Sequence, residues 1–459
     1  MHTPHVGNPH PPPNVIRTLA MEEPTISTAK DDGLLVQIAS YNTNLQGVLG
    51  LPQDLVDWLQ PTLQVSKFLA GGARAPDIVA VGFQELLPLH LGLAGWSEAV
   101  LNNRNELILS QIEELAPKKE SYSLVAKIAN VGIALLVYAR DDGLARRVAD
   151  VQTTWTGSGP AFMGNKGAVG VRFRVAGEGE DDGEVFTFVN CHLTAHTPNR
   201  QARIKDYKHI VSTLLFNPTS VDPKESPLKT LYDTSHLFVF GDMNFRVELP
   251  STHSLYDVAK TPLFSDAISA EATRKELVEH DQLTQEMRKG NVFVGLHEGD
   301  FWRFKCSYKY KIGTVDQYST KRTPSWTDRI LYATYTDTPE KSSVKNLAYT
   351  SIPSYTTSDH KPIVAVLLLP PSARNAAPSQ VIPTITLPAS YKPSADPQAN
   401  LKRYIGKTLD RFVGIIWWIF TILGAGSGIF GLVNFLVGLG AFTWWKGRPV
   451  DGYAPTPNV

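Results

Sequence analysis

Apolar and polar residues alternate along the chain in short runs, and this pattern predicts a fold that mixes strands with helices. Between residues 33 and 369, runs rich in β-branched and aromatic residues predict strands. These runs are residues 35–39, 77–81, 132–137, 185–189, 238–240, 330–332 and 363–366. Longer patterns typical of helices intervene at residues 54–69, 96–115, 200–215 and 272–289. Because no internal repeat accompanies this mixture, we predict an α/β sandwich of two packed β-sheets flanked by helices.

Two segments of biased composition flank the predicted sandwich, which we place at residues 31–369. Residues 1–30 are rich in proline and histidine and contain no apolar core, so we expect a disordered leader and no signal peptide. Residues 370–400 contain seven prolines among alanine and serine. This composition predicts a linker that is part polyproline II and part coil.

The last part of the chain, residues 401–459, has the pattern of a membrane anchor. Residues 412–445 include no ionisable side chain, and a buried helix of a globular core rarely runs so long. More basic residues precede this stretch than follow it, so we expect the larger domain to be cytosolic. A single tilted transmembrane helix is our first expectation, and a hairpin that turns at residues 424–428 is the alternative. Gly424 and Gly428 also form a Gly-x-x-x-Gly pattern, which favours self-association of membrane helices, although a glycine-rich break gives the same pattern.

Charge and cysteine content disfavour some classes of function. The chain carries 44 basic and 44 acidic residues, and this balance argues against nucleic acid as a partner. Basic residues are nevertheless concentrated between residues 303 and 329, which suits a compact polyanion or, alternatively, a solvated basic loop. Cys191 and Cys306 are the only cysteines, so a reducing compartment is favoured. Neither begins a Cys-x5-Arg phosphate loop, which disfavours a cysteine phosphoenzyme.

Polar side chains follow several of the predicted strands at the point where each strand ends. Asp242 and Asn244 follow the run 238–240, and their spacing of two puts them on the same side of extended backbone. Glu85 ends another strand and offers the hard oxygen that Mg²⁺ prefers, and Asn42 ends the first strand. Each of these is also a common strand exit, and Asp-x-Asn is frequent in Asx turns. Their recurrence predicts a shared polar rim.

Two histidines join this set. His192 follows an alternating apolar strand, although an isolated histidine there is more often structural. His360 precedes a strand, and a carboxylate would fix its tautomer and stabilise its cation. Asp328 and Asp359 are both candidates for that carboxylate. Hydrolysis of a phosphate monoester needs charge neutralisation, an oriented water and hydrogen-bond donors, and the rim offers a candidate for each.

Three segments of the chain together resemble the inositol polyphosphate 5-phosphatases, a family of the DNase-I-like metal-dependent phosphoesterases. They are residues 238–246, residues 357–362 and the segment Arg-Thr-Pro-Ser-Trp-Thr-Asp-Arg-Ile-Leu at residues 322–331, which is the most specific. The resemblance covers residues 36–369. It implies a DNase-I-like four-layer sandwich, in which two packed sheets are flanked by helices.

The resemblance also implies roles for individual residues of the rim. Glu85 would hold Mg²⁺ with help from Asn42. Asp242 would activate the attacking water, and Asn244 and His192 would contact the scissile phosphate. The residues that would stabilise the charge of the transition state are His360, its orienting partner Asp328 and, in support, Asp359.

Two further segments resemble those that bind the other phosphates of the substrate. The glycine-rich segment with Asn165 and Lys166 resembles the loop that grips the 1-phosphate, whereas a plain hairpin turn is the alternative. Tyr308 and Lys309 resemble the residues that read the 4-phosphate. The chain departs from the family pattern Lys-x-Arg-x-Pro, because Thr320 stands at the lysine position. The candidates for the remaining contact are Lys321 and Arg322.

The motifs and the anchor together predict a Mg²⁺-dependent phosphoinositide 5-phosphatase at the cytosolic face of a membrane. Its expected reaction converts phosphatidylinositol 4,5-bisphosphate to the 4-phosphate, because confinement to a surface favours a lipid substrate. The order of domain, linker and tail resembles fungal tail-anchored 5-phosphatases of the endoplasmic reticulum. The alternatives are another enzyme of the same fold, such as a sphingomyelinase or an endonuclease, and an inactive scaffold that binds phosphoinositides.

Overall fold

A computed structural model describes five stretches of the chain and a few residues near its C-terminal end. These are residues 33–45, 74–177, 183–218, 227–372 and 382–424, together with residues 433, 436–440 and 443. The predicted leader 1–30, the predicted helix 54–69 and residue 428 of the Gly-x-x-x-Gly pattern lie outside the described residues. Most of the predicted membrane segment beyond residue 424 lies outside them as well.

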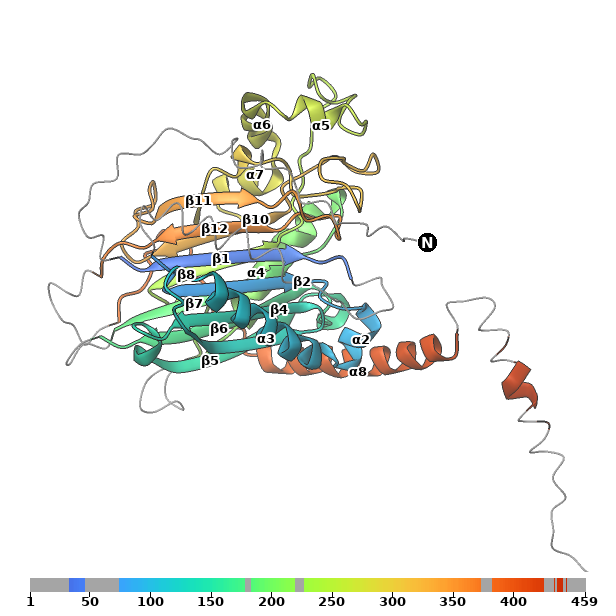
Figure 1. The fold of residues 1–459 in the computed structure, drawn as a ribbon, viewed down its shortest axis with the longest axis horizontal. Helices are drawn as coiled ribbons and strands as arrows, with labels where there is room; N and C mark the ends of the chain where they lie inside the picture. Colours follow the sequence, from blue (N-terminus) through green and yellow to red (C-terminus); the bar gives the residue numbers. More distant parts are fainter. Residues whose placement is uncertain are drawn as a thin grey trace, which may run out of the picture. The chain divides into compact units, whose positions relative to one another are not determined.

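The strands of these described stretches form two six-stranded sheets (Figure 1). The first has the order β11-β12-β1-β2-β4-β3, with the bounds Lys345–Ser351, Ile363–Leu368, Leu35–Asn42, Ile78–Gln84, Ile133–Arg140 and Tyr122–Asn130. The second has the order β5-β6-β7-β8-β10-β9, with the bounds Val148–Gly157, Gly167–Val175, Glu184–His192, His236–Asp242, Asp328–Thr334 and His297–Glu298. The pairs β1–β2 and β7–β8 are parallel, and the other pairs in the two sheets are antiparallel. Each run predicted as a strand overlaps one of these strands.

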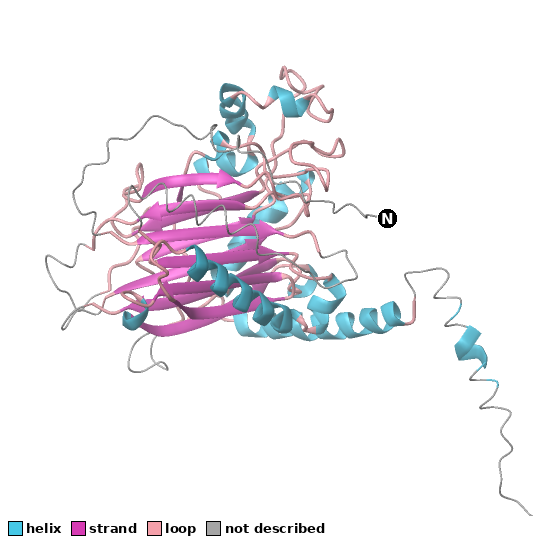
Figure 2. Cartoon of the chain, viewed as in Figure 1, coloured by secondary structure: helices cyan, strands magenta, loops and turns pink. Residues whose placement is uncertain are grey.

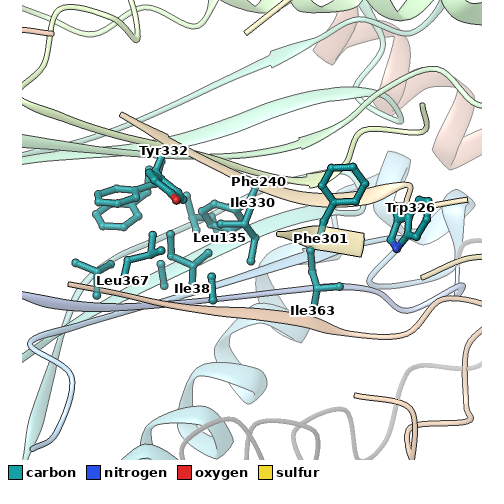
Figure 3. Packing of buried hydrophobic residues seen from close by; sticks show 14 of the residues in the cluster. Ile38, Leu135, Phe240, Phe301, Trp326, Ile330, Tyr332, Ile363 and Leu367 are labelled. Carbon is teal, nitrogen blue, oxygen red and sulfur yellow. The ribbon is translucent and has the colours of Figure 1, made fainter. Parts of the chain in front are cut away.

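The two sheets pack face to face through apolar side chains on their inner surfaces (Figure 3). Ile38 and Leu367 of the first sheet face Phe240 and Tyr332 of the second. Successive side chains of a strand point to opposite faces, and the outward residues of the central strands are also buried. Central strands such as β2 and β8 are therefore apolar on both faces, which is why they appear as continuous apolar runs.

Helices cover the outer faces of the sheets, so the fold has four layers (Figure 2). Helix α3 (Ser97–Leu115) packs on the first sheet and α4 (Arg200–Thr213) on the second. The shorter helices are α2 (Leu89–Ala94), α5 (Phe264–Ala267), α6 (Glu271–Leu277) and α7 (Gln282–Arg288). The single helix predicted at 272–289 is wrong, because Asp281 starts α7 anew by accepting a hydrogen bond from Thr284 N (2.9 Å). The predicted four-layer sandwich is confirmed.

Residues 382–424 contact the sandwich, in the region where composition predicts a linker and an anchor. The hydroxyls of Tyr391 and Tyr207 are 2.8 Å apart, and Asp396 N donates to Ser212 O (2.9 Å), so this segment lies along α4. Helix α8 (Ala399–Ile422) then packs against α2 (Figure 1). Within the described stretches, no helix combines the length and the apolar content that crossing a membrane requires. The transmembrane segment and the domain boundaries stay predictions.

Candidate active site

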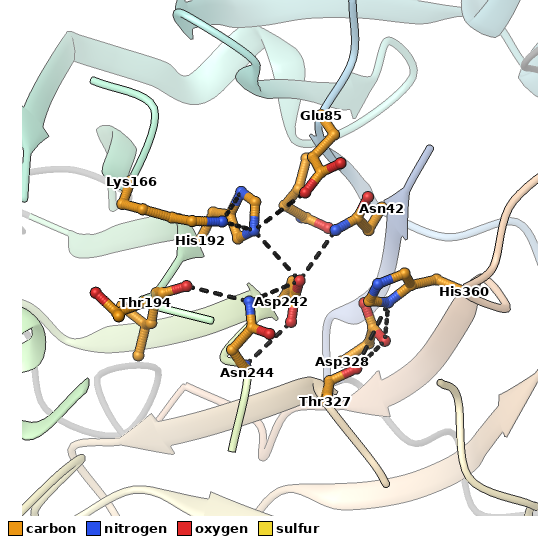
Figure 4. A network of polar contacts seen from close by, with 12 residues as sticks. Asn42, Glu85, Lys166, His192, Thr194, Asp242, Asn244, Thr327, Asp328 and His360 are labelled. Carbon is orange, nitrogen blue, oxygen red and sulfur yellow. Dashed lines mark hydrogen bonds and ion pairs between the residues drawn. The ribbon is translucent and has the colours of Figure 1, made fainter. Parts of the chain in front are cut away.

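The central strands of the second sheet bring three predicted site residues side by side. In the parallel pair β7–β8, His192 is the register partner of Asp242. In the antiparallel pair β8–β10, Asp242 is the register partner of Asp328. All three side chains are buried. The strand ends of this sheet therefore form the polar rim that the sequence predicts (Figure 4).

The first sheet contributes Asn42 and Glu85 from the carboxyl ends of its parallel pair. Asn42 Nδ2 donates to Asp242 Oδ2 (2.9 Å), so this hydrogen bond joins the two sheets. Glu85 follows β2 directly, and its Oε1 lies 3.7 Å from His192 Nε2. Residues from both sheets thus converge on one site, as Figure 4 shows.

Asp242 is the centre of this polar network. Its Oδ2 accepts hydrogen bonds from Asn42 Nδ2 and Asn244 Nδ2 (2.9 Å each), and its Oδ1 accepts from Asn244 N (3.0 Å). His192 Nε2 lies 3.3 Å from the same Oδ2. Burial alone would raise the pKa of Asp242, but its hydrogen bond with His192 and the charge of His360 hold that pKa well below its usual range. The side chain is therefore an ionised acceptor at neutral pH.

Lys166 and His192 form a second contact on the rim. Lys166 Nζ lies within hydrogen-bonding distance of His192 Nε2, and the following Gly167 is the register partner of His192. Burial lowers the pKa of His192, and the nearby ammonium group of Lys166 lowers it further. Burial also lowers the pKa of Lys166, against the carboxylates of Glu85 and Asp242. The imidazole of His192 is therefore neutral at neutral pH.

His360 and Asp328 form a buried ion pair, with 2.9 Å between His360 Nδ1 and Asp328 Oδ2. Asp359, the other candidate partner, pairs with Lys309 Nζ instead. Burial alone would lower the pKa of His360, but the carboxylate of Asp328 raises it to about 10. Asp328 Oδ2 also accepts hydrogen bonds from the hydroxyls of Ser307 and Thr327. His360 is therefore a cation at neutral pH, and Asp328 is the residue that orients it.

This ion pair leads to the prediction that Asp328→Asn lowers the pKa of His360 from about 10 to its ordinary value of 6.5 or below. Because the pKa of His360 is higher in the folded than in the unfolded chain, protonation of His360 stabilises the fold. This stabilisation is fully present below pH 6.5 and is lost as the pH rises through about 10. Titration of the imidazole signals by nuclear magnetic resonance measures the shift. Asp359→Asn is the control and should change the pKa of His360 less, because Asp359 pairs with Lys309. Equal shifts in the two variants would contradict the assignment of Asp328.

Arg246 is a site residue that the motif analysis does not assign. Its guanidinium donates to the side-chain oxygen of Asn244 and, through Nε, to Asn244 O (3.1 Å). It also lies 4.3 Å from the ring centroid of Tyr308 and is buried. The sequence holds a signal for it, because Arg246 follows Asn244 at the same spacing of two that separates Asn244 from Asp242.

Some of the residues predicted to bind the substrate lie at the rim. Lys166 lies at the rim, with Asn165 beside it in the loop between β5 and β6. The ring centroid of Tyr308 lies 4.5 Å from that of His360, which places Tyr308 at the rim as well.

Lys309, Lys321 and Arg322 are placed differently from this group. Burial alone would lower the pKa of Lys309, but its pairing with Asp359 raises that pKa, so it carries a fixed positive charge. The residues Lys321 and Arg322 are exposed, and Arg322 Nη1 donates to Lys321 O (3.3 Å). None of these three residues is among those labelled in Figure 4.

The chemistry of the rim fits a divalent cation. Glu85 and Asn42 present a carboxylate and an amide beside the ionised Asp242, and Mg²⁺ prefers a few such oxygen ligands. The carboxylates of Glu85 and Asp242 oppose the effect of burial on the pKa of Lys166, so both contribute negative charge at this place. The residues that would hold the metal are therefore the predicted ones, Glu85 and Asn42.

A second cluster of metal-ligating side chains overlaps the first. Asp242, Asp328 and His360 have ligand atoms that lie within 4.8 Å of one another. The protonated imidazole of His360 already balances the charge of Asp328, and a cationic imidazole offers no lone pair to a metal. We therefore interpret His360 in this cluster as a hydrogen-bond donor and not as a metal ligand.

Comparison with known proteins identifies the family. Residues 39–366 match the family model described as Endonuclease/Exonuclease/phosphatase family 2. The type II inositol 1,4,5-trisphosphate 5-phosphatase of Mus musculus is 32% identical over 302 residues, which are 65% of this chain and 27% of the relative. A polyphosphatidylinositol phosphatase of Saccharomyces cerevisiae is 30% identical over 318 residues, which are 68% of this chain and 25% of the relative.

A solved structure is similar as well. It is the inositol polyphosphate 5-phosphatase domain of SPsynaptojanin, in complex with inositol (1,4)-bisphosphate and calcium. The two structures agree with a TM-score of 0.52 and 26% sequence identity, over 73% of this chain and 84% of the other. The predicted DNase-I-like fold is thereby confirmed.

The fold is of the DNase-I-like kind, with a polar rim at its strand ends. The chain belongs to the endonuclease/exonuclease/phosphatase family. Its predicted resemblance to the inositol polyphosphate 5-phosphatases is confirmed by the names of its relatives. The chain spans about a quarter of the length of these two curated relatives.

Proposed function

We propose that this chain is a Mg²⁺-dependent phosphoinositide 5-phosphatase that converts phosphatidylinositol 4,5-bisphosphate to phosphatidylinositol 4-phosphate. The observation that carries the proposal is the network in which Asp242 accepts from Asn42 and Asn244 and lies beside His192. The His360–Asp328 pair adds a cation at the same rim. A phosphatase needs this combination of an ionised acceptor and fixed positive charge, whereas a scaffold needs only the positive charge.

The residues of the rim have separate tasks in this reaction. Bound Mg²⁺ supplies charge neutralisation at the scissile phosphate. Asp242 orients the attacking water as a hydrogen-bond acceptor, since its low pKa makes it a weak base. A loose transition state requires little removal of the water's proton, so orientation is the larger contribution. The cationic His360 donates to a phosphate oxygen, and Asn244 holds the side chain of Asp242 in place.

The choice of substrate rests on positive side chains around the rim. Lys166, Arg246 and Lys309 lie near the site residues His192, Asn244 and Asp359 respectively. Charge-assisted contacts of this kind suit an inositol ring that carries several phosphates. The names of the relatives include inositol trisphosphate and polyphosphatidylinositol as substrates of those proteins.

The C-terminal residues support a lipid as the substrate of this chain. We propose that residues 401–459 attach the enzyme to a membrane, with the sandwich in the cytosol and the endoplasmic reticulum as the location. Most apolar side chains of α8 from Phe412 to Ile422 are exposed, which matches attachment to a lipid surface. Confinement to that surface raises the effective concentration of a lipid headgroup at the site.

A turnover comparison across phosphoinositide isomers tests this function. The wild-type chain should release phosphate from the 4,5-bisphosphate and the 5-monophosphate, and should leave the 4-monophosphate and the 3-monophosphate intact. Phosphate release from the 4-monophosphate would show that the chain does not select the 5-position.

Lys309→Ala is expected to impair substrates with a 4-phosphate more than those without it. The fixed charge of Lys309 provides one charge-assisted contact, which is worth roughly 1.5–3 kcal/mol. Values of kcat/KM on the 4,5-bisphosphate and on the 5-monophosphate measure the difference. Lys305→Ala is the matched control, since Lys305 pairs with the exposed Asp316 in the same segment. Equal losses on both substrates in Lys309→Ala would remove this residue from the 4-phosphate site.

A further inference from the structure

Helix α8 packs against the two segments that lead to site residues of the rim. One is the loop between β5 and β6, in which Gly164 comes two residues before Lys166. The other is α2, which begins four residues after Glu85. Helix α8, which lies outside the sandwich, thus contacts segments next to Lys166 and Glu85, and both of these residues lie near His192.

The contact between α8 and these segments is made by backbone as well as side chains. Gly406, Asp410 and Gly414 are spaced by four residues and therefore lie along one face of α8, because residues that are four apart are neighbours on a helix. A Cβ atom at Gly406 would lie 1.9 Å from Phe162 O, and one at Gly414 would lie 2.3 Å from Ala94 N. Only glycine permits α8 to approach both segments this closely.

Asp410 lies between these glycines and is buried, with 2% of its surface exposed. Its carboxylate accepts from Gly164 N, at 3.1 Å from Oδ1 and 3.0 Å from Oδ2. Burial raises the pKa of Asp410 to about 6, although the Gly164 amide and the charge of Arg411 oppose this. A buried carboxylate is tolerated where it is hydrogen-bonded, so the helix and the loop are held together by this contact.

Basic residues on either side of Asp410 make further contacts between α8 and the sandwich. The guanidinium of Arg403 lies 4.8 Å, and Nζ of Lys407 5.4 Å, from the ring centroid of Trp155 on β5. Arg411 Nη1 donates to Leu93 O at the end of α2 (2.7 Å). The basic residues that the sequence marks as the flank of an anchor therefore also bind α8 to the sandwich.

We propose that Asp410 is a positioning residue for the loop 163–166 and that α8 thereby holds the substrate loop of the active site. The proposal rests on the proposed function and on the predicted resemblance of this loop to the one that grips the 1-phosphate of the inositol ring. Because the exposed apolar side chains from Phe412 onwards are on the same helix, α8 connects this loop to the segment that we expect at the membrane. Helix α8 then contributes to substrate binding through this loop, in addition to its expected role in membrane attachment.

Two soluble substrates that differ only in the 1-phosphate test this proposal on the full-length chain. They are inositol 1,4,5-trisphosphate and inositol 4,5-bisphosphate, and the readout is the ratio of their kcat/KM values. Asp410→Ala leaves the Gly164 amide without its acceptor, so this ratio should fall roughly tenfold, mainly through KM of the trisphosphate. Asp410→Asn keeps one acceptor oxygen and should retain most of the preference.

The control is Asp396→Asn, which removes the charge of another acid near α8, one whose carboxylate is bound by Lys402 and by Gln398 N. It should keep the wild-type ratio. In a Lys166→Ala background, Asp410→Ala should change the ratio no further, because both act through one loop. An unchanged ratio in Asp410→Ala alone, or an equal loss on both substrates, would overturn the proposal.

Hydrogen exchange tests the role of α8 independently of whether the proposed function is correct. Amides of residues 158–166 should exchange faster in Asp410→Ala than in Asp396→Asn, because the loop loses its outer contact. A wild-type chain that hydrolyses neither of these substrates nor phosphatidylinositol 4,5-bisphosphate would overturn the proposed function. The exchange measurement would still decide the role of α8, since unchanged exchange in Asp410→Ala overturns it.

Discussion

Replacement of Asp242 by asparagine is expected to lower kcat at least about a hundredfold while KM changes little. The carboxylate orients the attacking water, and an amide of the same shape offers one acceptor in place of two. Its NH₂ group would also face Asn42 Nδ2 or Asn244 Nδ2, and both of these atoms are donors that bind the carboxylate in the wild type. The loss falls on the transition state, so steady-state kinetics on a short-chain soluble phosphoinositide should show it in kcat.

Asp77→Asn is the matched control for this variant. Asp77 is another buried carboxylate, with 4% of its surface exposed, and it accepts from Leu35 N (2.7 Å) and pairs with Arg140 (2.9 Å). It precedes β2, whereas Glu85 follows that strand, so Asp77 lies at the opposite end of the sheet. The control should lower the free energy of unfolding and leave kcat within about twofold of wild type. Near-normal turnover in Asp242→Asn would show that this carboxylate is not catalytic.

His360→Gln should also lower kcat at least about a hundredfold, because glutamine cannot supply the cationic donor that Asp328 maintains. The remaining activity should lose the alkaline decline that the wild type shows as the pH rises through about 10. Profiles of kcat against pH measure both effects. His236→Gln is the control, since His236 forms a similar buried pair with Glu184 (3.0 Å) at the start of β8. An equal loss of kcat in the two variants would mean that the effect comes from damaged packing.

The sequence predicts the centre of the sheets better than their edges. The runs recognised as strands belong to β1, β2, β4, β7, β8, β10 and β12, which are interior strands. The four edge strands β3, β5, β9 and β11 have no predicted counterpart. Strands β3 and β5 are only partly buried, so polar side chains interrupt their pattern. Strand β6 is also missed, although its apolar residues alternate with glycine and arginine as in a strand with one polar face.

The rim was predictable because its residues follow strand ends, which are visible as abrupt changes from apolar to polar residues. The partners of those residues were less predictable, because they come from tertiary contacts. Position in the sequence makes both Asp328 and Asp359 candidates for His360, and the family resemblance favours Asp328. Only the fold shows that Asp359 pairs with Lys309. Composition likewise cannot show that a proline-rich stretch lies along α4 or that α8 places a carboxylate on Gly164.

The most direct test of the account is phosphate release from phosphatidylinositol 4,5-bisphosphate by the full-length chain, with and without Mg²⁺. We expect Mg²⁺-dependent release of one phosphate per lipid, with phosphatidylinositol 4-phosphate as the product and loss of activity after chelation. Asp242→Asn should remain at least about a hundredfold slower than the wild type at any Mg²⁺ concentration. Release that is independent of the metal, or a folded wild-type chain that binds the lipid and releases no phosphate, would contradict the account.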